Sequence, residues 1–510
     1  MTNSLLLPEE TATAAGHGPC PLRCPDCRAT PTFAPTPTQP LPGGWFGVLR
    51  CDCHTDPVLD SIPILRRGPI DVQDHVTGRT EIEGPDHDTL VAMLEADRGL
   101  EALVEMLTFP PAVPFGLARR RGLRLPFTRG PWPRLAREAR RGEVAEMLAD
   151  VEALTAQDWM ELCYARSSEQ IAGDIFPYFF ARFGQPRYVA SIEMARHLPV
   201  GRGPVLDLAC GFGHLMYHLG ARDEAVETVG VDRNFFQLWV GRRYVAPDQR
   251  FVCADRVDAL PFADDAFAAS LCSDAFHLFD AQQGAADEMR RVAADDTIIL
   301  DRLGNRFLEP FDSTFERSPE GYADLVGDAP VRLTSEDELI GAYRAGRGLD
   351  LTRERDTAGL AEQKWLYLVS SRDERVFADT DEIAGTPHGA GSLRVNPIFR
   401  VDRIDGDDRD DEAVHLVFDY PSAWYAFENA VMRTYTSAGE RLDPDAFEEV
   451  AAGRPVPETP RLLRRWVVLG MPPRYARPPG APGAVGSVAR GLLRGAVRRL
   501  RHRRCSDRVQ

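Results

Sequence analysis

Residues 205–215, VLDLACGFGHL, form an apolar run that ends abruptly in a loop with glycines at positions 211 and 213. A strand that ends at Asp207 and breaks into such a loop before a helix lets a ligand approach main-chain N–H groups without obstruction by a Cβ atom. The loop would then lie at the carboxyl edge of a parallel sheet, where open α/β folds bind nucleotides. We therefore expect a nucleotide-like ligand at this loop.

Apolar runs alternate with helical stretches from residue 204 onward, among them VLDLAC, VETVGVD, RFVCAD, AFAASLCSD and TIILDR. This alternation is typical of a parallel sheet covered by helices. A helix near EDELIGAYRAG and strands near LDLTRER and KWLYLVSSR complete the pattern. The sequence therefore predicts an α/β fold.

The 510-residue chain is too long for one hydrophobic core, which predicts about three domains. Its formal net charge of −17 argues against a nucleic-acid substrate, because phosphate contacts need local positive charge. No apolar run reaches the roughly eighteen residues of a membrane span, and the N-terminus lacks the basic start and apolar region of an export signal. We therefore expect a cytoplasmic protein.

Composition and periodicity divide the chain into five segments. Residues 1–75 hold a cysteine cluster, and residues 76–166 repeat apolar positions at helical spacing. The α/β domain spans residues 167–378, and a small strand-containing accessory module follows at 379–479. The tail, residues 480–510, can form a basic amphipathic helix that contacts an anionic membrane surface, but two glycines weaken the helix and a solvated tail is the favoured interpretation.

The glycine loop excludes two common nucleotide motifs. A dinucleotide fingerprint needs a third glycine where this chain has Met216, and no GK[ST] follows to make a phosphate-binding loop. An acid, Asp232, ends the next strand nineteen residues past Gly213, which suits a carboxylate that accepts both ribose hydroxyls. Asp255 follows the third strand and can accept from an exocyclic adenine amine.

The motifs DLACGFG, VGVD, CADRVDALPFADDAFAASLCSDAFHLF and EMRRVAADDTIIL have the order and spacing of class I S-adenosylmethionine-dependent methyltransferases. Over about residues 189–371 the chain most resembles the type 11 branch of that family. The resemblance implies a Rossmann-like sheet, with S-adenosyl-L-methionine bound along its edge. It assigns the methionine part to the loop, the ribose to Asp232 and the adenine to Asp255 with the backbone of Arg256. The loop residues are Asp207, Ala209, Gly211 and Gly213, where Ala209 replaces the commonest first glycine.

The stretch SDAFHLF follows the fourth strand, which faces the methyl group in the family that this chain resembles. A sulfonium methyl is already activated, so transfer mainly needs an in-line nucleophile held close in a water-poor pocket. We assign Ser273 to the cofactor pocket, and Asp274 and His277 to catalysis. His277 has an intrinsic pKa that suits proton removal from a hydroxyl or an amine. The alternative is that His277 only packs against Phe276 and Phe279.

Five cysteines lie between Cys20 and Cys53, a pattern typical of a metal site rather than of disulfides. Cys24 and Cys27 form a C-x-x-C pair, and Cys51 with Cys53 completes a tetrahedral set for structural zinc. The C-x-C spacing is tight, and Cys51 with His54 would restore the usual gap. The following PVLDSIPIL is similar to the ending of small zinc-ribbon proteins that activate methyltransferases. Reduced cysteines without metal are the alternative.

The primary hypothesis is a methyltransferase that acts on a small or carrier-linked metabolite. An RNA methyltransferase is the second hypothesis, favoured by the zinc ribbon and by residues 119–141, which carry nine arginines and one acid. The acidity of the whole chain disfavours nucleic acid as a partner. A non-catalytic cofactor-binding scaffold is the third, and the intact loop acids make it the weakest.

Overall fold

The computed structural model describes most of the chain. The described residues are 22–38, 40–73, 82–108, 132–165, 171–199, 201–222, 225–308, 315–353, 357–380, 387–404, 413–478, 481 and 483. Cys20, the arginine-rich residues 119–131 and nearly all of the predicted tail lie outside them. Within the described residues, no helix combines the length and the apolar character needed to cross a membrane.

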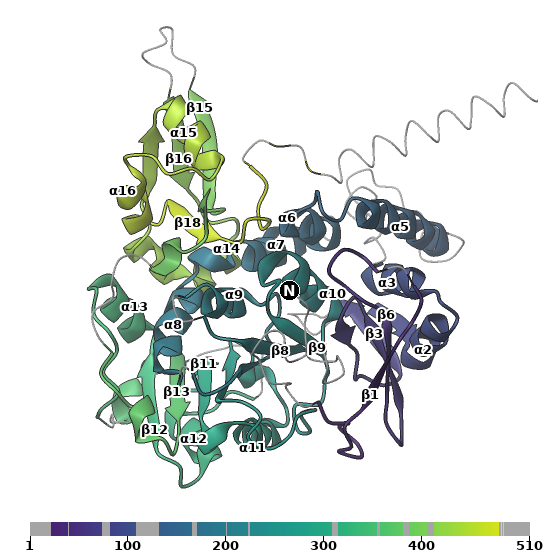
Figure 1. Ribbon diagram of the computed structural model, residues 1–510. Helices are drawn as coiled ribbons and strands as arrows, with labels where there is room; N and C mark the ends of the chain where they lie inside the picture. The colour runs from purple at the N-terminus through teal and green to yellow at the C-terminus, as the bar shows by residue number, and fades with distance from the viewer. Residues whose placement is uncertain are drawn as a thin grey trace, which may run out of the picture.

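The largest element is a seven-stranded sheet with the strand order β12-β13-β11-β10-β7-β8-β9 (Figure 1). Its strands are β7 (Val205–Leu208), β8 (Thr228–Asp232), β9 (Arg250–Cys253), β10 (Ala269–Ser273), β11 (Ile298–Gly304), β12 (Val331–Ser335) and β13 (Trp365–Ser370). Strands β7 to β11 pair in parallel, whereas β13 is antiparallel to both of its neighbours. The predicted Rossmann-like α/β fold is confirmed.

Helices cover both faces of this sheet, because successive strand residues point to opposite sides. Leu206 packs in one apolar core with Ala285 and Met289, whereas its neighbour Val205 packs in another with Met194 and Leu219. The surrounding helices are α8 (Pro186–Met194), α9 (His214–Gly220), α10 (Phe235–Val240), α11 (Gln282–Val292), α12 (Pro319–Ala323) and α13 (Glu336–Arg344).

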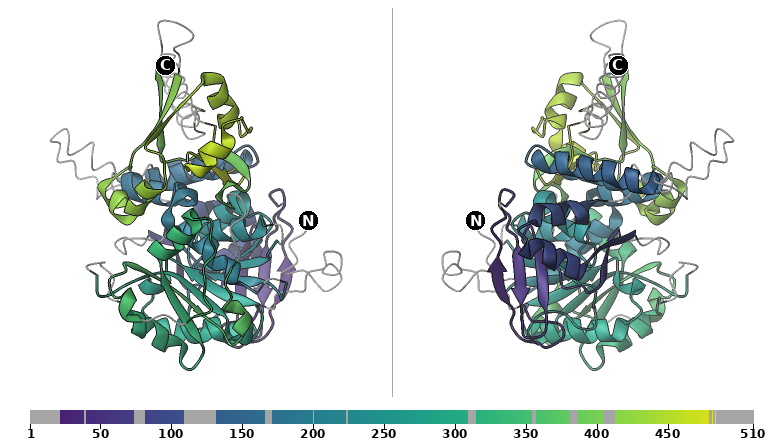
Figure 2. Two further views of the ribbon diagram at one scale, coloured as in Figure 1. Left: turned by 90° about the vertical axis from the view of Figure 1, so that its left-hand side faces the viewer. Right: turned by 90° about the vertical axis from the view of Figure 1, so that its right-hand side faces the viewer.

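A small antiparallel sheet from the N-terminal segment lies beside the edge strand β9 (Figures 1 and 2). It contains β1 (Thr32–Pro35), β2 (Gly47–Arg50), β3 (Thr55–Leu59) and β4 (Ile62–Pro63). Directly after β4, Ile64 forms a parallel bridge with Cys253, and the Leu65 N–H donates to the Cys253 carbonyl at 2.8 Å. The N-terminal segment therefore continues the hydrogen bonding of the central sheet.

Helical elements connect this small sheet to the central domain. They are preceded by the pair β5 (Pro69–Gln73) and β6 (Ile82–Asp86). The helices are α2 (His87–Glu95), α3 (Gly99–Leu107), α5 (Trp132–Ala149), α6 (Ala156–Met160) and α7 (Phe176–Phe180), with π-helical turns at Glu161–Ala165 and Ile171–Ile175. Their apolar faces share one core with the N-terminal sheet and with α10.

The C-terminal module stands on the helices next to the central sheet (Figures 1 and 2). Its strands are β14 (Ser392–Val395), β15 (Phe399–Ile404), β16 (Ala413–Phe418), β17 (Gly439–Leu442) and β18 (Val468–Met471), and its helices are α14 (Ala423–Glu428), α15 (Pro444–Ala451) and α16 (Thr459–Arg464). The module has its own apolar core. It contacts the preceding helices where Tyr435 donates to the Gly184 carbonyl at 3.0 Å and Gln185 donates to Tyr425 at 3.1 Å.

A buried carboxylate, Asp60, joins the N-terminal segment to α10. It is fully buried and accepts from Trp239 Nε1 at 2.8 Å and from Arg243 Nε at 2.6 Å. We expect Asp60→Ala to lower the free energy of unfolding by about 3–5 kcal/mol, because the Arg243 charge would stay buried without its partner. Urea unfolding followed by tryptophan fluorescence measures this. Glu146, an exposed residue of α5, provides the control, and Glu146→Ala should leave the unfolding midpoint unchanged. Equal effects of Asp60→Ala and Glu146→Ala would contradict the assignment.

Candidate functional site

The loop after β7 has the backbone shape that its glycines predict. Gly211 and Gly213 have φ angles of 55° and 72°, in the left-handed region that disfavours residues with a Cβ atom. A Cβ atom on Gly213 would also lie 3.0 Å from the Phe251 ring. Ala209 adopts φ 60° in the same loop, so it carries the strain that the more common glycine would avoid. The loop backbone at residues 209–211 remains partly exposed at the carboxyl edge of the sheet.

Asp232, at the end of β8, fixes this loop to the next one. Its Oδ2 accepts from the Gly211 N–H at 2.9 Å, and its Oδ1 accepts from the Asn234 N–H at 2.8 Å. Each carboxylate oxygen has two lone pairs, so these backbone bonds are compatible with hydroxyl groups of a ligand on the same carboxylate. Asp232 is buried, with 9% of its surface exposed at the end of β8.

Three acids concentrate negative charge beneath the loop. Burial, with the nearby charges of Asp232 and Asp301, raises the pKa of Asp207 well above its usual range. Burial also raises the pKa of Asp301, on β11, to about 7. Carboxylates that repel each other in this way favour a cationic group beside them. The cluster therefore suits the positively charged part of a ligand.

On the other side of Asp232, the N-terminal segment contributes to the site. Arg66 Nε lies 3.2 Å from Asp255 Oδ2, and Arg66 Nη1 donates to the Arg233 carbonyl at 2.7 Å. Arg66 is 5% exposed, whereas the Asp255 side chain is 38% exposed. Arg256 is exposed and its Nη1 lies 3.3 Å from Asp26 in the cysteine-rich turn. The sequence motifs do not indicate Arg66 as a site residue. Its position directly after PVLDSIPIL is the one feature that could have pointed to it.

Ser273 and Asp274 lie where β10 ends. The Ser273 Oγ is 3.1 Å from Ser191 Oγ on α8. Asp274 adopts φ 59° and its carboxylate binds Arg302 Nη1 at 2.7 Å, Arg182 Nη1 at 3.1 Å, Arg187 Nη1 and the Tyr178 hydroxyl. Burial would raise the pKa of Asp274, but the three arginines hold it well below its usual range.

His277 lies in the short helical turn that follows Asp274. It is 6% exposed, and its ring centroid is 5.8 Å from that of Trp365. Burial lowers the pKa of His277 to about 4, although the Asp274 charge acts in the opposite direction. The imidazole is therefore neutral at physiological pH and has a lone pair that can accept a proton.

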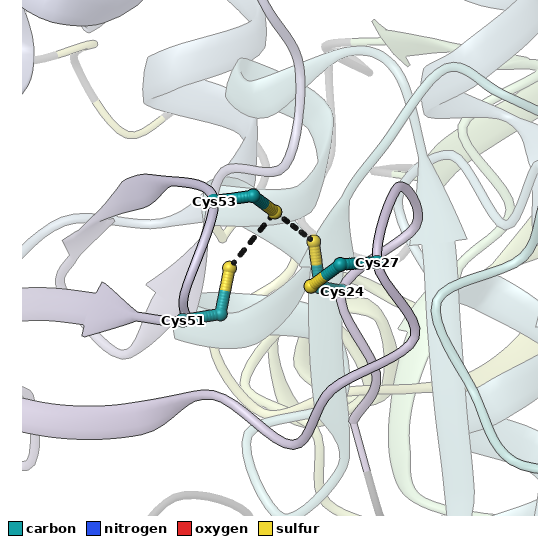
Figure 3. Close-up of side chains that lie close together, drawn as sticks. All are labelled: Cys24, Cys27, Cys51 and Cys53. Atoms are coloured by element: carbon teal, nitrogen blue, oxygen red, sulfur yellow. Dashed lines mark hydrogen bonds between the residues drawn. The ribbon is translucent and has the colours of Figure 1, made fainter.

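The four predicted cysteine ligands converge in the N-terminal segment (Figure 3). Cys24 and Cys27 come from the turn before β1, and Cys51 and Cys53 come from the turn between β2 and β3. All four sulfurs lie within 4.8 Å of one another. In a tetrahedral site with Zn–S bonds of about 2.3 Å, the sulfurs are about 3.8 Å apart, so this geometry fits zinc.

The alternative ligand, His54, points elsewhere. Its Nε2 lies 3.0 Å from Asp26 Oδ2. Cys53 occupies the fourth position instead, with its Sγ 3.5 Å from Cys24 Sγ and 3.4 Å from Cys51 Sγ. The structure therefore brings together the Cys24, Cys27, Cys51 and Cys53 set that the sequence predicts.

Comparison with known proteins identifies the central domain. Residues 205–296, from β7 to the turn before β11, match a family model described as a methyltransferase domain. The chain contains a methyltransferase domain. This match and the Rossmann-like sheet confirm the class I methyltransferase fold, and the protein is an enzyme.

Solved structures similar to this chain include several methyltransferases. One is a chain of the complex between the Haloferax volcanii Trm112 methyltransferase activator and a methyltransferase, with 19% identity and a TM-score of 0.30, covering 39% of this chain and 96% of that one. A Bacillus halodurans methyltransferase has 14% identity and a TM-score of 0.24 and covers 35% and 96%, respectively. A TehB-like methyltransferase from Corynebacterium glutamicum has 13% identity and a TM-score of 0.26 and covers 36% and 86%. No curated protein matches the chain.

The methyltransferase domain implies S-adenosyl-L-methionine as cofactor, and the site residues fit this molecule. Its sulfonium and ammonium charges suit the acids Asp207, Asp232 and Asp301, where burial and the charges of Asp232 and Asp301 raise the pKa of Asp207. The glycine loop leaves room for the amino-acid part, and the Asp232 carboxylate can accept from ribose hydroxyls. The Asp255 side chain is 38% exposed, and its contact with the adenine amine stays a prediction.

The zinc assignment predicts opposite effects for two neighbouring residues. We expect about one zinc ion per chain, because four thiolates form a closed tetrahedral site. Cys53→Ala should lose the metal and His54→Ala should retain it, since only the cysteine faces the other sulfurs. Inductively coupled plasma mass spectrometry of the purified variants measures the stoichiometry. Retention by the first variant and loss by the second would make His54 the ligand.

The low pKa of His277 predicts acid sensitivity. The unfolded chain would bind a proton at His277 near pH 6.5, whereas the folded protein does so only near pH 4, so acidification through this window favours unfolding. We expect the melting temperature of His277→Gln to fall less between pH 7 and pH 5 than that of the wild type. A matched variant of the half-buried His415 on β16, His415→Gln, serves as the control in the same calorimetric scans. Identical slopes for His277→Gln and the wild type would contradict the burial argument.

Proposed function

We propose that the protein transfers a methyl group from S-adenosyl-L-methionine to a small-molecule or carrier-linked metabolite. The observation that carries this proposal is the pair of bonds from Gly211 and Asn234 to the Asp232 carboxylate, at the mouth of the bare loop after β7. These bonds fix the loops after β7 and β8 relative to each other at one end of the site. The loop after β10 occupies the other end.

The loop after β7 is held in shape from below. Phe212 is 1% exposed and packs against Phe179, with ring centroids 5.3 Å apart, and against Tyr164 at 6.4 Å. This packing holds the loop in one conformation, so the cofactor would bind to a backbone that is already arranged. Such preorganisation lowers the cost of holding the cofactor and the acceptor in line.

The cofactor supplies an activated sulfonium methyl group when bound, so the protein mainly has to position the acceptor and exclude water. Neutral His277 can accept a hydrogen bond from an acceptor hydroxyl or amine, but its pKa of about 4 makes it a weak base. Asp274 is a weak proton acceptor, because its three arginine partners keep it ionised. We therefore assign Asp274 to positioning those arginines beside the reaction centre.

The described part of the arginine-rich stretch supports a metabolite rather than RNA as substrate. Arg137 and Arg141, on α5, both bind the Glu105 carboxylate of α3, at 3.0 Å and 2.7 Å. Arg140 is buried and donates to the Leu162 carbonyl at 2.9 Å. Each of these arginines already has a partner within the protein, whereas an RNA-binding surface needs charges that are available to contact phosphates.

Asp232 provides the direct test of the cofactor site. We expect Asp232→Ala to weaken binding of S-adenosyl-L-homocysteine at least about 100-fold, because two charge-assisted hydrogen bonds to the ribose are lost. Isothermal titration calorimetry with the purified chain measures the affinity. Asp248→Ala changes an exposed acid in the turn before β9 and should bind as the wild type does.

Circular dichroism of both variants separates a lost ligand contact from a lost fold. A folded Asp232→Ala variant with wild-type affinity would exclude the ribose assignment. Absence of binding by the wild type would exclude the proposed activity altogether.

A further inference from the structure

A buried group of charged side chains surrounds Asp274, on the side of Ser273 away from the glycine loop. We call it the arginine cluster. It consists of the cations Arg182, Arg187, Arg302 and Lys364 and the carboxylates Asp274, Glu336 and Glu428. Methyl transfer as such does not require so many charges. Their place beside β10 puts them where the acceptor is expected.

The cluster gathers residues from six parts of the chain. Arg187 is on α8 and Arg302 is on β11, whereas Lys364 directly precedes β13. Glu428 ends α14 of the C-terminal module and accepts from Arg302 Nη2 at 3.1 Å. The Lys364 Nζ lies 3.8 Å from Glu428 Oε1. The accessory module therefore completes the cluster rather than lying apart from it.

Irregular backbone directs two members of the cluster toward each other. Arg302 adopts φ 53° where the pairing of β11 with β13 shifts register between Leu300 and Leu303. Its guanidinium lies 3.6 Å from the centre of the Trp365 ring. Asp274 also adopts a left-handed φ. Bulges and strained residues of this kind persist where a side chain must point to a particular place, and they occur preferentially at functional sites.

Positive charge exceeds negative charge in the arginine cluster. Within the described chain, four cations face three carboxylates, and burial raises the pKa of Glu336, which weakens its negative charge. Buried charges are costly unless they are paired. The ion pairs of the cluster therefore carry an excess of positive charge that an anionic ligand would balance.

Arg187 shows where that anion would bind. It is 1% exposed, and its Nη1 binds Asp274, but its Nε and Nη2 make no hydrogen bond to any described residue. The Nη2 is 4.0 Å from Glu428 Oε2, beyond hydrogen-bond distance. Nε and Nη2 form one edge of the guanidinium, the edge that binds a carboxylate or phosphate with two parallel hydrogen bonds.

An exposed aromatic ring contacts the exposed end of the cluster, and two further exposed apolar side chains belong to segments next to cluster residues. The Lys364 side chain is 31% exposed, and its Nζ lies 4.0 Å from the centre of the Phe427 ring. Phe427 is 58% exposed, and Leu278, in the turn after Asp274, is 51% exposed. Phe307 is 57% exposed, and its N–H donates to Asn305, which in turn donates to the Lys364 carbonyl. Large exposed apolar side chains next to a charged group are typical of a binding surface.

We propose that the methyl acceptor is an amphiphilic anion. Its carboxylate or phosphate group binds the free edge of Arg187, assisted by Arg182 and Lys364, and its apolar body lies against Leu278, Phe307 and Phe427. This inference rests on the proposed methyltransferase function and names the substrate class of the same site.

The test uses four probes with the same eight-carbon chain and different head groups. Octanoate and octyl phosphate are anions, octan-1-ol is neutral, and octylamine is a cation. Calorimetry with the full chain saturated with S-adenosyl-L-homocysteine should show at least about tenfold tighter binding of one anion than of the alcohol or the amine. Tighter binding of octanoate identifies a carboxylate acceptor, and tighter binding of octyl phosphate identifies a phosphate acceptor. Equal affinity for all four probes would overturn the proposal.

Substitutions locate the probe in the arginine cluster. We expect Lys364→Met and Arg182→Gln each to weaken binding of the preferred anion at least about tenfold, and to leave binding of S-adenosyl-L-homocysteine unchanged. The exposed Arg347, after α13, provides the matched control, and Arg347→Gln should bind the anion as the wild type does. Folded Lys364→Met and Arg182→Gln variants with wild-type anion affinity would place the anion elsewhere and overturn the proposal.

The outcome for the acceptor is separable from the outcome for the cofactor. If the protein binds S-adenosyl-L-homocysteine but does not discriminate among the probes, the amphiphilic-anion proposal is wrong and the methyl-transfer proposal is retained. The probes are also titrated without S-adenosyl-L-homocysteine. If S-adenosyl-L-homocysteine does not bind, the methyl-transfer proposal is wrong, and the comparison of head groups still tests the anion site.

Discussion

The Asp232 carboxylate accepts hydrogen bonds from the backbone of two loops, one after β7 and one after β8. Those loops leave neighbouring parallel strands at the same edge of the sheet, so a single side chain determines the spacing between them. The left-handed residues of the first loop can keep their conformation because one of their N–H groups is held in this way. The relative position of the two loops depends on this contact.

The same edge of the sheet depends on residues far away in the sequence. The cysteine-rich segment reaches β9 through Ile64 and Leu65, and Arg66 then binds Asp255 and the Arg233 carbonyl. A metal ion that orders the four cysteines would therefore also stabilise the contacts of Arg66 at this edge of the sheet. Three consecutive residues, Ile64, Leu65 and Arg66, connect the cysteine-rich segment to the end of β9.

The sequence predicts the central sheet well because strands with both faces buried read as continuous apolar runs, and because the acids Asp207, Asp232 and Asp255 follow those runs directly. The cysteine ligands are predictable for a similar reason, since metal ligands have characteristic local spacing. The arginine cluster was not predictable. Arg187, Arg302 and Lys364 are separated by more than one hundred and by more than sixty residues, and no local pattern relates them. Their meeting depends on a bulge in β11 and on the position of α14, which only the tertiary structure gives.

The pairing of Ile64 with Cys253 also covers part of an edge strand of the central sheet. Strand β9 is at the end of the sheet, and an uncovered end presents unpaired N–H and carbonyl groups that can pair with another chain. The N-terminal segment pairs with part of this edge strand. A methyltransferase domain expressed alone would thus expose a strand edge suited to intermolecular association. The segment that holds the cysteines therefore also reduces the tendency to aggregate.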